Sequence, residues 1–135
     1  MGRYLLDSHI FLWFKRNPSK LGKTALAEIE NTENTLFVSG IGLWELADKA
    51  SKGKLPEFAA IMDRGPGALE FALRESGFRL LPLELLHMAR AYRLVHHHGD
   101  PFDRLMIAQA LVEDLIFISR DTAFRRYAGL KLLAA

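Results

Sequence analysis

The sequence predicts an α/β fold built around a parallel sheet. Short apolar runs alternate along the chain with longer segments in which apolar residues recur at intervals of three and four positions. The first pattern is typical of buried strands and the second of helices, and their regular alternation favours a parallel sheet. A chain of 135 residues fits one domain with a substantial hydrophobic core. We therefore expect residues 1–135 to fold as a single domain.

Four or five strands are expected in the sheet. The apolar runs that predict them are Arg3–Leu6, Thr35–Ser39, Phe78–Leu81, Leu115–Ser119 and Lys131–Leu133. The sheet has five strands if the last run joins it and four if it does not.

Helical spacing of apolar residues marks the segments between these runs. The expected helices are Lys23–Glu30, Leu43–Lys52, Ala68–Ser76, Leu85–Leu94 and Pro101–Val112. Residues 52–68 are rich in glycine and proline, which predicts a mobile loop within the domain. A short helix at Glu57–Met62 can interrupt that loop.

Composition narrows the classes of function. Lys and Arg number 18 against 16 Asp and Glu, so any role with nucleic acid must rest on a local site rather than on bulk attraction. The chain contains no Cys, which excludes disulfides and thiolate metal ligands and fits a reducing compartment. The apolar stretch Tyr4–Phe14 is interrupted by polar residues, is far shorter than the roughly 20 residues of a membrane span, and lacks a signal-peptide layout. We expect a cytoplasmic protein without a membrane segment.

Four acidic residues stand where the strands are expected to end. Asp7 follows the first strand directly, and Asp121 comes two residues after the run that ends at Ser119. Glu45 lies in the opening turns of the helix after Thr35–Ser39, and Asp103 lies in the first turn of the last helix. Ligands of open parallel sheets bind beyond the carboxyl ends of the strands, so all four side chains can share one pocket there.

Each acid also has a purely structural interpretation. Asp7 or Asp121 alone could be a turn residue or a helix N-cap. Glu45 could pair with Lys49 one helical turn later. Asp103 could complete a capping-box-like helix start in which Asp100 is the N-cap. Asp100 can also cap the helix by itself, which leaves Asp103 free to point toward a metal.

Convergence of four carboxylates would require positive charge. Two carboxylates about 4 Å apart repel by roughly 4 kcal/mol at an effective dielectric constant of about 20, so a cation or protons must offset the repulsion. Oxygen ligands of high charge suit Mg²⁺ or Mn²⁺, which often bridge to substrate phosphates. The pattern therefore points to phosphodiester chemistry, in which such an ion activates water and neutralises developing charge.

Four segments, in order along nearly the whole chain, resemble the PIN-domain family and especially its VapC-like toxins. They read LLDSH at residues 5–9, SGIGLWEL at 39–46, DPFDRLMIAQA at 100–110 and SRD at 119–121. The third segment is the most specific of them. A single acidic residue outside such a segment would not indicate the family.

The resemblance implies a PIN-like three-layer α/β/α fold and RNA cleavage that depends on Mg²⁺ or Mn²⁺. It implies that catalytic, metal-binding carboxylates are Asp7, Glu45, Asp103 and Asp121. VapC-like members are ribonuclease toxins that commonly dimerise and that a small antitoxin inhibits by covering the active-site groove. The resemblance therefore also implies an antitoxin partner and a homodimer.

Three positions depart from the usual family pattern. Ser8 and Ser119 stand where Thr is common, and both keep a hydroxyl that can support the carboxylates. Gly42 stands where a second Ser is common and lacks that hydroxyl. We expect Ser8 and Ser119 to be supporting residues, and the loss at Gly42 puts one hydrogen bond to the site in doubt.

Basic residues and histidines near the acids are further candidates. Arg104 could contact a scissile phosphate, and Arg120, Arg125 and Arg126 could follow an RNA backbone. The same charges could equally be solvated surface. The histidines at 96–98 alternate faces in an extended segment, so we expect a surface loop rather than a metal site.

Two other functions fit parts of the pattern. A phospho-acceptor signalling module also gathers acids at strand ends, but it needs an acceptor Asp at the end of a middle strand. Neither Thr35–Ser39 nor Phe78–Leu81 ends in one. A non-catalytic binding module, in which the acids only cap helices, is the remaining alternative.

Overall fold

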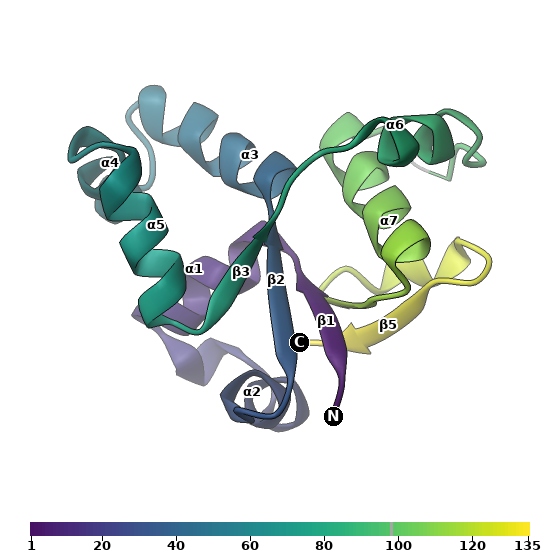
Figure 1. Ribbon diagram of the computed structural model, residues 1–135, viewed down its shortest axis with the longest axis horizontal. Helices are drawn as coiled ribbons and strands as arrows, with labels where there is room; N and C mark the ends of the chain where they lie inside the picture. The colour runs from purple at the N-terminus through teal and green to yellow at the C-terminus, as the bar shows by residue number, and fades with distance from the viewer. Residues whose placement is uncertain (98) are drawn as a thin grey trace.

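The computed structural model describes residues 1–97 and 99–135. Five strands form one sheet in the order β3-β2-β1-β4-β5, and every neighbouring pair is parallel (Figure 1). The strands are β1 (Arg3–Leu6), β2 (Thr35–Ser39), β3 (Phe78–Leu81), β4 (Ile116–Ser119) and β5 (Lys131–Ala134). The expected parallel sheet is confirmed, and the last apolar run joins it as the fifth strand.

Seven α-helices lie in the described residues. They are α1 (Ser8–Arg16), α2 (Lys23–Glu30), α3 (Gly40–Ser51), α4 (Pro56–Asp63), α5 (Pro66–Glu75), α6 (Leu85–Tyr92) and α7 (Pro101–Glu113). Two 3₁₀ helices, η1 (Pro18–Lys20) and η2 (Thr122–Arg126), complete the set. Within residues 1–97 and 99–135, no helix has the length and apolar character that crossing a membrane requires.

All the expected helices are present, with one addition and several shifted ends. The addition is α1, which the sequence did not separate from β1 because apolar residues continue from the strand into the helix. The helix α4 confirms the short helix expected within residues 52–68. In the histidine run, His96 and His97 are exposed, while residue 98 lies outside the described residues.

Hydrophobic clusters cover both faces of the sheet and make three layers. Along β1, Leu6 faces a cluster that includes Phe11 of α1 and Phe58 of α4, whereas Leu5 faces a cluster that includes Met106 of α7. Alternate strand residues point to opposite faces, so one strand supports both clusters. The three-layer α/β/α arrangement is thus confirmed.

Strands pass directly into helices at the carboxyl edge of the sheet. Asp7 is the N-cap residue of α1, and its backbone N–H donates to the carbonyl of Ile118 in β4 (3.0 Å). The Asp7 side chain makes no capping hydrogen bond. Ser39 caps α3 by accepting the backbone N–H of Ile41 (3.0 Å). These junctions hold polar side chains at one edge, and the Asp7 carboxylate is not used by its own helix.

Asp100 caps α7. One carboxylate oxygen accepts the backbone N–H groups of Phe102 (2.9 Å) and Asp103 (3.2 Å). This pattern confirms the expected start of the helix, with Asp100 as the N-cap and Asp103 within the first turn.

Replacing the cap should lower stability. We expect Asp100→Ala to reduce the free energy of unfolding by about 1 kcal/mol, because two backbone donors lose their acceptor. Asp100→Asn keeps an acceptor oxygen and should lose much less. Urea denaturation of both variants, with Asp63→Ala at the exposed end of α4 as a control, measures the difference. Equal stability of Asp100→Ala and wild type would contradict the capping role.

Candidate active site at the carboxyl edge of the sheet

Four acidic side chains meet at this edge. Asp7 follows β1 and Asp121 follows the neighbouring strand β4, while Glu45 comes from α3 and Asp103 from the first turn of α7. The negative charges of the other three acids all act on Asp103. We call these residues the acid cluster: Asp7, Glu45, Asp103 and Asp121. The side chains singled out by sequence are thus brought together by the fold.

Two buried serines tie the acid cluster together. The Ser119 hydroxyl donates to Oδ2 of Asp7 (3.0 Å) and accepts the backbone N–H of Asp121 (3.0 Å). The Ser8 hydroxyl lies within hydrogen-bond distance of Oε1 of Glu45 (3.2 Å) and Oδ1 of Asp7 (3.4 Å). Neither serine is exposed to solvent. Each hydroxyl therefore fixes the position of a carboxylate that would otherwise rotate.

Gly42 allows this close approach. A Cβ atom at position 42 would lie 3.0 Å from Cβ of Ser8 and 3.2 Å from Sδ of Met106. Both distances are tighter than ordinary van der Waals contact. The absence of a side chain lets α1 and α3 pack closely enough for Ser8 to reach Glu45. In this chain, position 42 has no hydroxyl to donate to the site, and the absence of a side chain there lets α1 and α3 pack closely.

The surroundings of Asp103 shift the pKa of its carboxyl group. Its pKa is raised from 3.8 to about 7. Burial is the largest cause, followed by the charges of Asp100, Asp7, Glu45 and Asp121. Without a cation, the site therefore favours a proton on Asp103 at mildly acidic pH. A cation would substitute for that proton.

A buried hydrogen bond fixes α3 relative to α7. The Ser39 hydroxyl donates to Oε1 of Gln109 (2.5 Å), and the Gln109 amide donates to the carbonyl of Pro82 (3.3 Å). Both side chains are fully buried. The helices that carry Glu45 and Asp103 are thereby joined below the acid cluster.

The family model for the PIN domain matches residues 4–130. The chain belongs to the PIN-domain family. No curated protein matches its sequence.

Solved structures share the fold of this PIN domain. A chain of VapBC2 from Rickettsia felis, bound to a DNA fragment from its promoter, aligns with a TM-score of 0.72 and 20% identity over 98% of both chains. A chain of DNA-bound VapBC from Salmonella typhimurium gives 0.69 and 20% over 99% of this chain and 98% of the other. A toxin–antitoxin complex from Klebsiella pneumoniae gives 0.58 and 17% over 96% and 95%. At these identities the likeness establishes the fold alone.

Arg104 does not lie where the sequence suggested. Its guanidinium donates to the backbone carbonyls of Ala91 (2.9 Å), Leu94 (3.2 Å) and Val95 (3.2 Å), and only 9% of the residue is exposed. These carbonyls lie at the end of α6 and just beyond it. The expected contact with a scissile phosphate is therefore wrong, because the guanidinium donates its hydrogen bonds to these carbonyls and so joins the end of α6 to α7.

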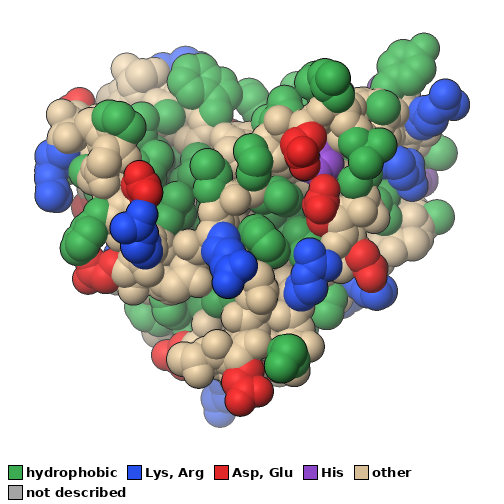
Figure 2. Space-filling view, in the orientation of Figure 1, with side chains coloured by type: hydrophobic (Ala, Val, Ile, Leu, Met, Phe, Trp, Pro, Cys, Tyr) green, Lys and Arg blue, Asp and Glu red, His purple; other side chains and the backbone are tan. Residues whose placement is uncertain are grey.

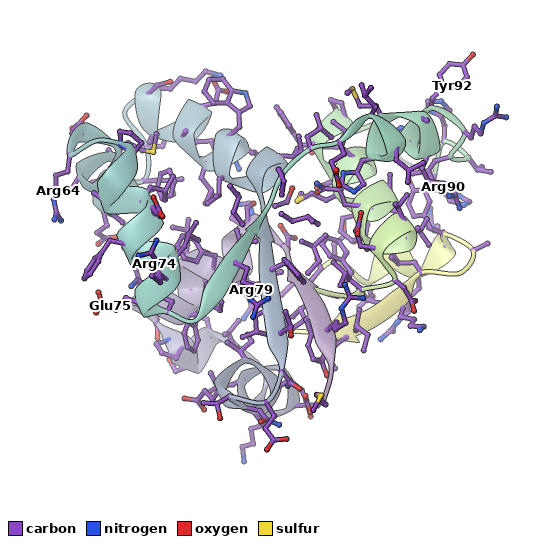
Figure 3. The ribbon with its side chains drawn as sticks, viewed as in Figure 1. Arg64, Arg74, Glu75, Arg79, Arg90 and Tyr92 are labelled. Atoms are coloured by element: carbon purple, nitrogen blue, oxygen red, sulfur yellow. The ribbon has the colours of Figure 1, made fainter. Side chains whose placement is uncertain are left out.

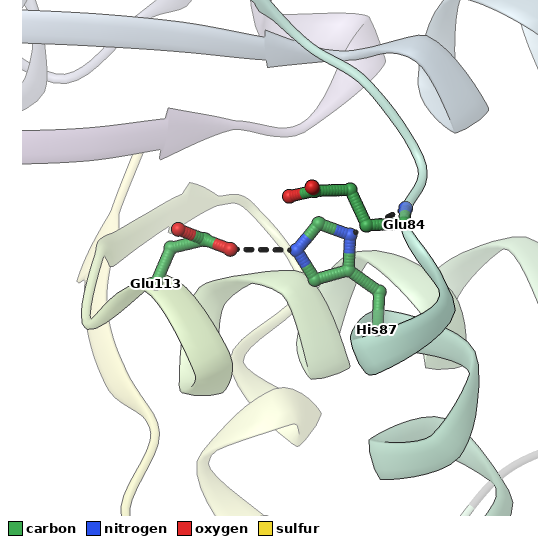
Figure 4. Close-up of side chains that lie close together, drawn as sticks. All are labelled: Glu84, His87 and Glu113. Carbon is green, nitrogen blue, oxygen red and sulfur yellow. Dashed lines mark hydrogen bonds and ion pairs between the residues drawn. The ribbon is translucent and has the colours of Figure 1, made fainter.

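A second group of potential ligands lies between α6 and α7. Within residues 1–97 and 99–135, the group whose ligand atoms all lie within 4.8 Å of one another is Glu84, His87 and Glu113 (Figure 4). The acid cluster does not meet this distance. Sequence reasoning missed the group, because nothing in the spacing of these three residues marks them as neighbours.

The hydrogen bonds of His87 leave no lone pair for a metal. Its Nδ1 lies 3.0 Å from the backbone N–H of Glu84, a donor, so Nδ1 must accept. The proton is then on Nε2, which donates to Oε2 of Glu113 (2.8 Å). Metal binding at Nε2 would leave a backbone donor unpaired. The group is therefore a structural link between α6 and α7.

Several residues beside the acid cluster were not singled out from the sequence as site residues. His9 lies 4.0 Å from Asp7 and 3.4 Å from the ammonium of Lys49. Trp13, one turn after His9, lies under the guanidinium of Arg120. Lys49 contacts His9, and among the described residues no ion pair joins it to Glu45. The only sequence signal was position, since His9 stands two residues after Asp7 and Trp13 follows His9 one helical turn later.

The raised pKa of Asp103 predicts a pH-dependent stability. Between about pH 4 and pH 7, Asp103 keeps its proton in the folded state and has lost it in the unfolded chain. Without divalent cations, the free energy of unfolding should therefore fall as the pH rises through this range. Asp103→Asn removes this proton uptake and should flatten the dependence. Urea denaturation in a chelator measures it, with Asp63→Asn as the control. Identical pH profiles for Asp103→Asn and wild type would contradict the assignment.

Proposed function

We propose that this PIN domain is a metal-dependent endoribonuclease and the toxin of a toxin–antitoxin pair that acts in the cytoplasm. The observation that carries the proposal is the convergence of the acid cluster at the carboxyl edge, with two buried serines holding its oxygens. Carboxylates that lie near one another in a folded protein repel, and the repulsion lowers stability. Function is the simplest reason for keeping all four together.

The donor set fits Mg²⁺ or Mn²⁺. Asp7, Glu45, Asp103 and Asp121 offer only carboxylate oxygens, which these hard cations prefer. When bound, such an ion lowers the pKa of a water molecule and neutralises charge on the phosphate. The chain itself orients the ligands through Ser8 and Ser119, and Asp103 would hold such an ion in its deprotonated form.

Basic side chains beside the acid cluster support a polyanionic substrate. A groove of about 490 Å³ that includes Glu45 is lined by Lys49, Lys52 and Lys54. Asp48 and Asp100 also line it, and Asp48 pairs with Lys52 (3.0 Å), so Lys49 and Lys54 are the cations left for a phosphate. On the other side of the cluster, the exposed Arg120 borders Asp121. Local cations on both sides suit an RNA backbone that crosses the carboxylates, although the net charge of the chain is small.

We further propose an antitoxin partner and a homodimer. The structural neighbours include chains of VapBC assemblies and of a toxin–antitoxin complex. Large apolar side chains are exposed on and around α6, among them Leu85, Leu86 and Tyr92. Hydrophobic atoms gather over this helix in Figure 2, and Tyr92 projects away from the body of the molecule in Figure 3. Such a surface is suited to contact with another protein.

Nuclease activity should depend on the acid cluster and not on the group beside α6. With Mn²⁺, purified protein should cleave single-stranded RNA, and Asp7→Asn and Asp103→Asn should each lower the rate on the order of a hundredfold or more. Wild type should also gain thermal stability with rising Mn²⁺ concentration, and both variants should lose that gain.

Glu84→Gln is the matched control, because Glu84 is an exposed acid of the other group. It should retain cleavage and the Mn²⁺-dependent gain. Absence of RNA cleavage by wild type, with Asp7→Asn and Asp103→Asn binding Mn²⁺ as wild type does, would leave a non-catalytic binding module as the better description.

A further inference from the structure

A pocket opens directly beside the acid cluster, and the proposed chemistry leaves most of its lining unexplained. Its volume is about 320 Å³, and its walls are Asp7, His9, Ile10, Trp13, Arg120 and Asp121. Two of these residues belong to the acid cluster. The rest add two aromatic rings, an aliphatic side chain and a guanidinium. The pocket therefore combines flat, apolar surfaces with access to the candidate catalytic carboxylates.

Trp13 and Arg120 form a cation–π pair in this pocket. The guanidinium carbon lies 4.4 Å from the centroid of the indole ring. Arg120 also donates to the backbone carbonyl of Lys20, and the ammonium of Lys20 lies 5.9 Å from the same ring. Although Arg120 is an exposed residue, the ring and the carbonyl hold its guanidinium in place. A fixed, planar cation at the rim of an active site is suited to binding a planar group or a phosphate.

His9 supplies the second ring. Its ring centroid lies 6.0 Å from that of Trp13, with the planes inclined by 42°. The ammonium of Lys49 can only donate, so Nε2 of His9 accepts from it and Nδ1 bears the proton on the side of Asp7. His9 thus lies between Trp13 and Lys49 and contacts both. The side chain is 40% exposed and is available to a ligand.

These groups match the chemistry of a single-stranded nucleobase. Unpaired bases in RNA are bound by stacking on Trp and His rings and on Arg guanidinium planes, with cations nearby for the backbone. A purely structural role would account for the part of Trp13 that packs on the core. A structural role for Trp13 would not explain why His9 and the guanidinium of Arg120 also line an open pocket beside the acid cluster.

On the basis of the proposed nuclease function, we propose that this pocket binds one nucleobase of the RNA substrate, from a nucleotide that borders the scissile phosphate. The base lies against Trp13, His9 and the guanidinium of Arg120. The phosphate between this nucleotide and the next then falls at Asp7 and Asp121, which line both the pocket and the acid cluster. The pocket positions the RNA and contributes to the choice of cleavage site.

The test combines protein variants with abasic nucleotides. After the cut in a short single-stranded RNA is mapped with Mn²⁺-loaded protein, each nucleotide flanking it is replaced in turn by an abasic one. One abasic position should lower kcat/KM for wild type by roughly 5- to 100-fold, the range for loss of one stacked base. Trp13→Ala should cause a similar loss on intact RNA and show no further loss at that same position.

Several readouts separate substrate positioning from folding. Trp13→Phe should recover most of the activity, and the exposed Arg120→Ala should show the same insensitivity to the abasic position without risk to the core. Both should keep the Mn²⁺-dependent gain in melting temperature. Trp44→Ala is the matched control, since Trp44 is 60% exposed and does not line the pocket, and it should behave as wild type.

The outcomes distinguish this proposal from the nuclease proposal. If wild type cleaves RNA and Trp13→Ala and Arg120→Ala retain full activity and full sensitivity to every abasic position, the base pocket is wrong and the nuclease stands. If wild type cleaves nothing, the nuclease is wrong, and the binding of intact and abasic RNA to wild type and Trp13→Ala decides the pocket. Unchanged RNA binding with weakened antitoxin binding would assign the pocket to a protein partner and overturn the proposal.

Discussion

The fold buries Asp103 beside three other carboxylates at the carboxyl edge of the sheet, and the free energy of this arrangement must be offset within the site. The pKa of Asp103 is raised to about 7, first by burial and then by the charges of Asp100, Asp7, Glu45 and Asp121. Nearby carboxylates repel one another, more strongly where the surroundings exclude water. Hydrogen bonds from Ser8 and Ser119 offset part of the cost. A proton on Asp103 offsets part of the rest, and the cation that we propose for this site would take the place of that proton.

Short distances between potential ligands do not by themselves make a metal site. Glu84, His87 and Glu113 lie closer together than the acid cluster does. Both ring nitrogens of His87 are nonetheless already engaged, since Nε2 donates its proton to Glu113 and Nδ1 accepts a backbone N–H. The acid cluster instead offers four carboxylates and no ring nitrogen that a hydrogen bond already occupies. The engagement of the His87 nitrogens distinguishes the two groups better than separation does.

The sequence predicted the sheet and the meeting point of the four acids because both follow from local patterns. Apolar runs mark the strands, and Asp7 and Asp121 come one and two residues after the ends of neighbouring parallel strands. Contacts between distant segments were not predictable in this way. Arg104 stands next to Asp103 in sequence, yet its guanidinium points to α6. The pairing of Trp13 with Arg120 joins residues more than a hundred positions apart, and α1 was hidden because its apolar residues continue those of β1.

The location of a bound metal tests the account most directly. Crystals soaked in Mn²⁺ and measured at the manganese absorption edge would show the ion by its anomalous signal. We expect a peak among the carboxylates of Asp7, Glu45, Asp103 and Asp121. A peak beside His87 between Glu84 and Glu113, with none at the acid cluster, would contradict it.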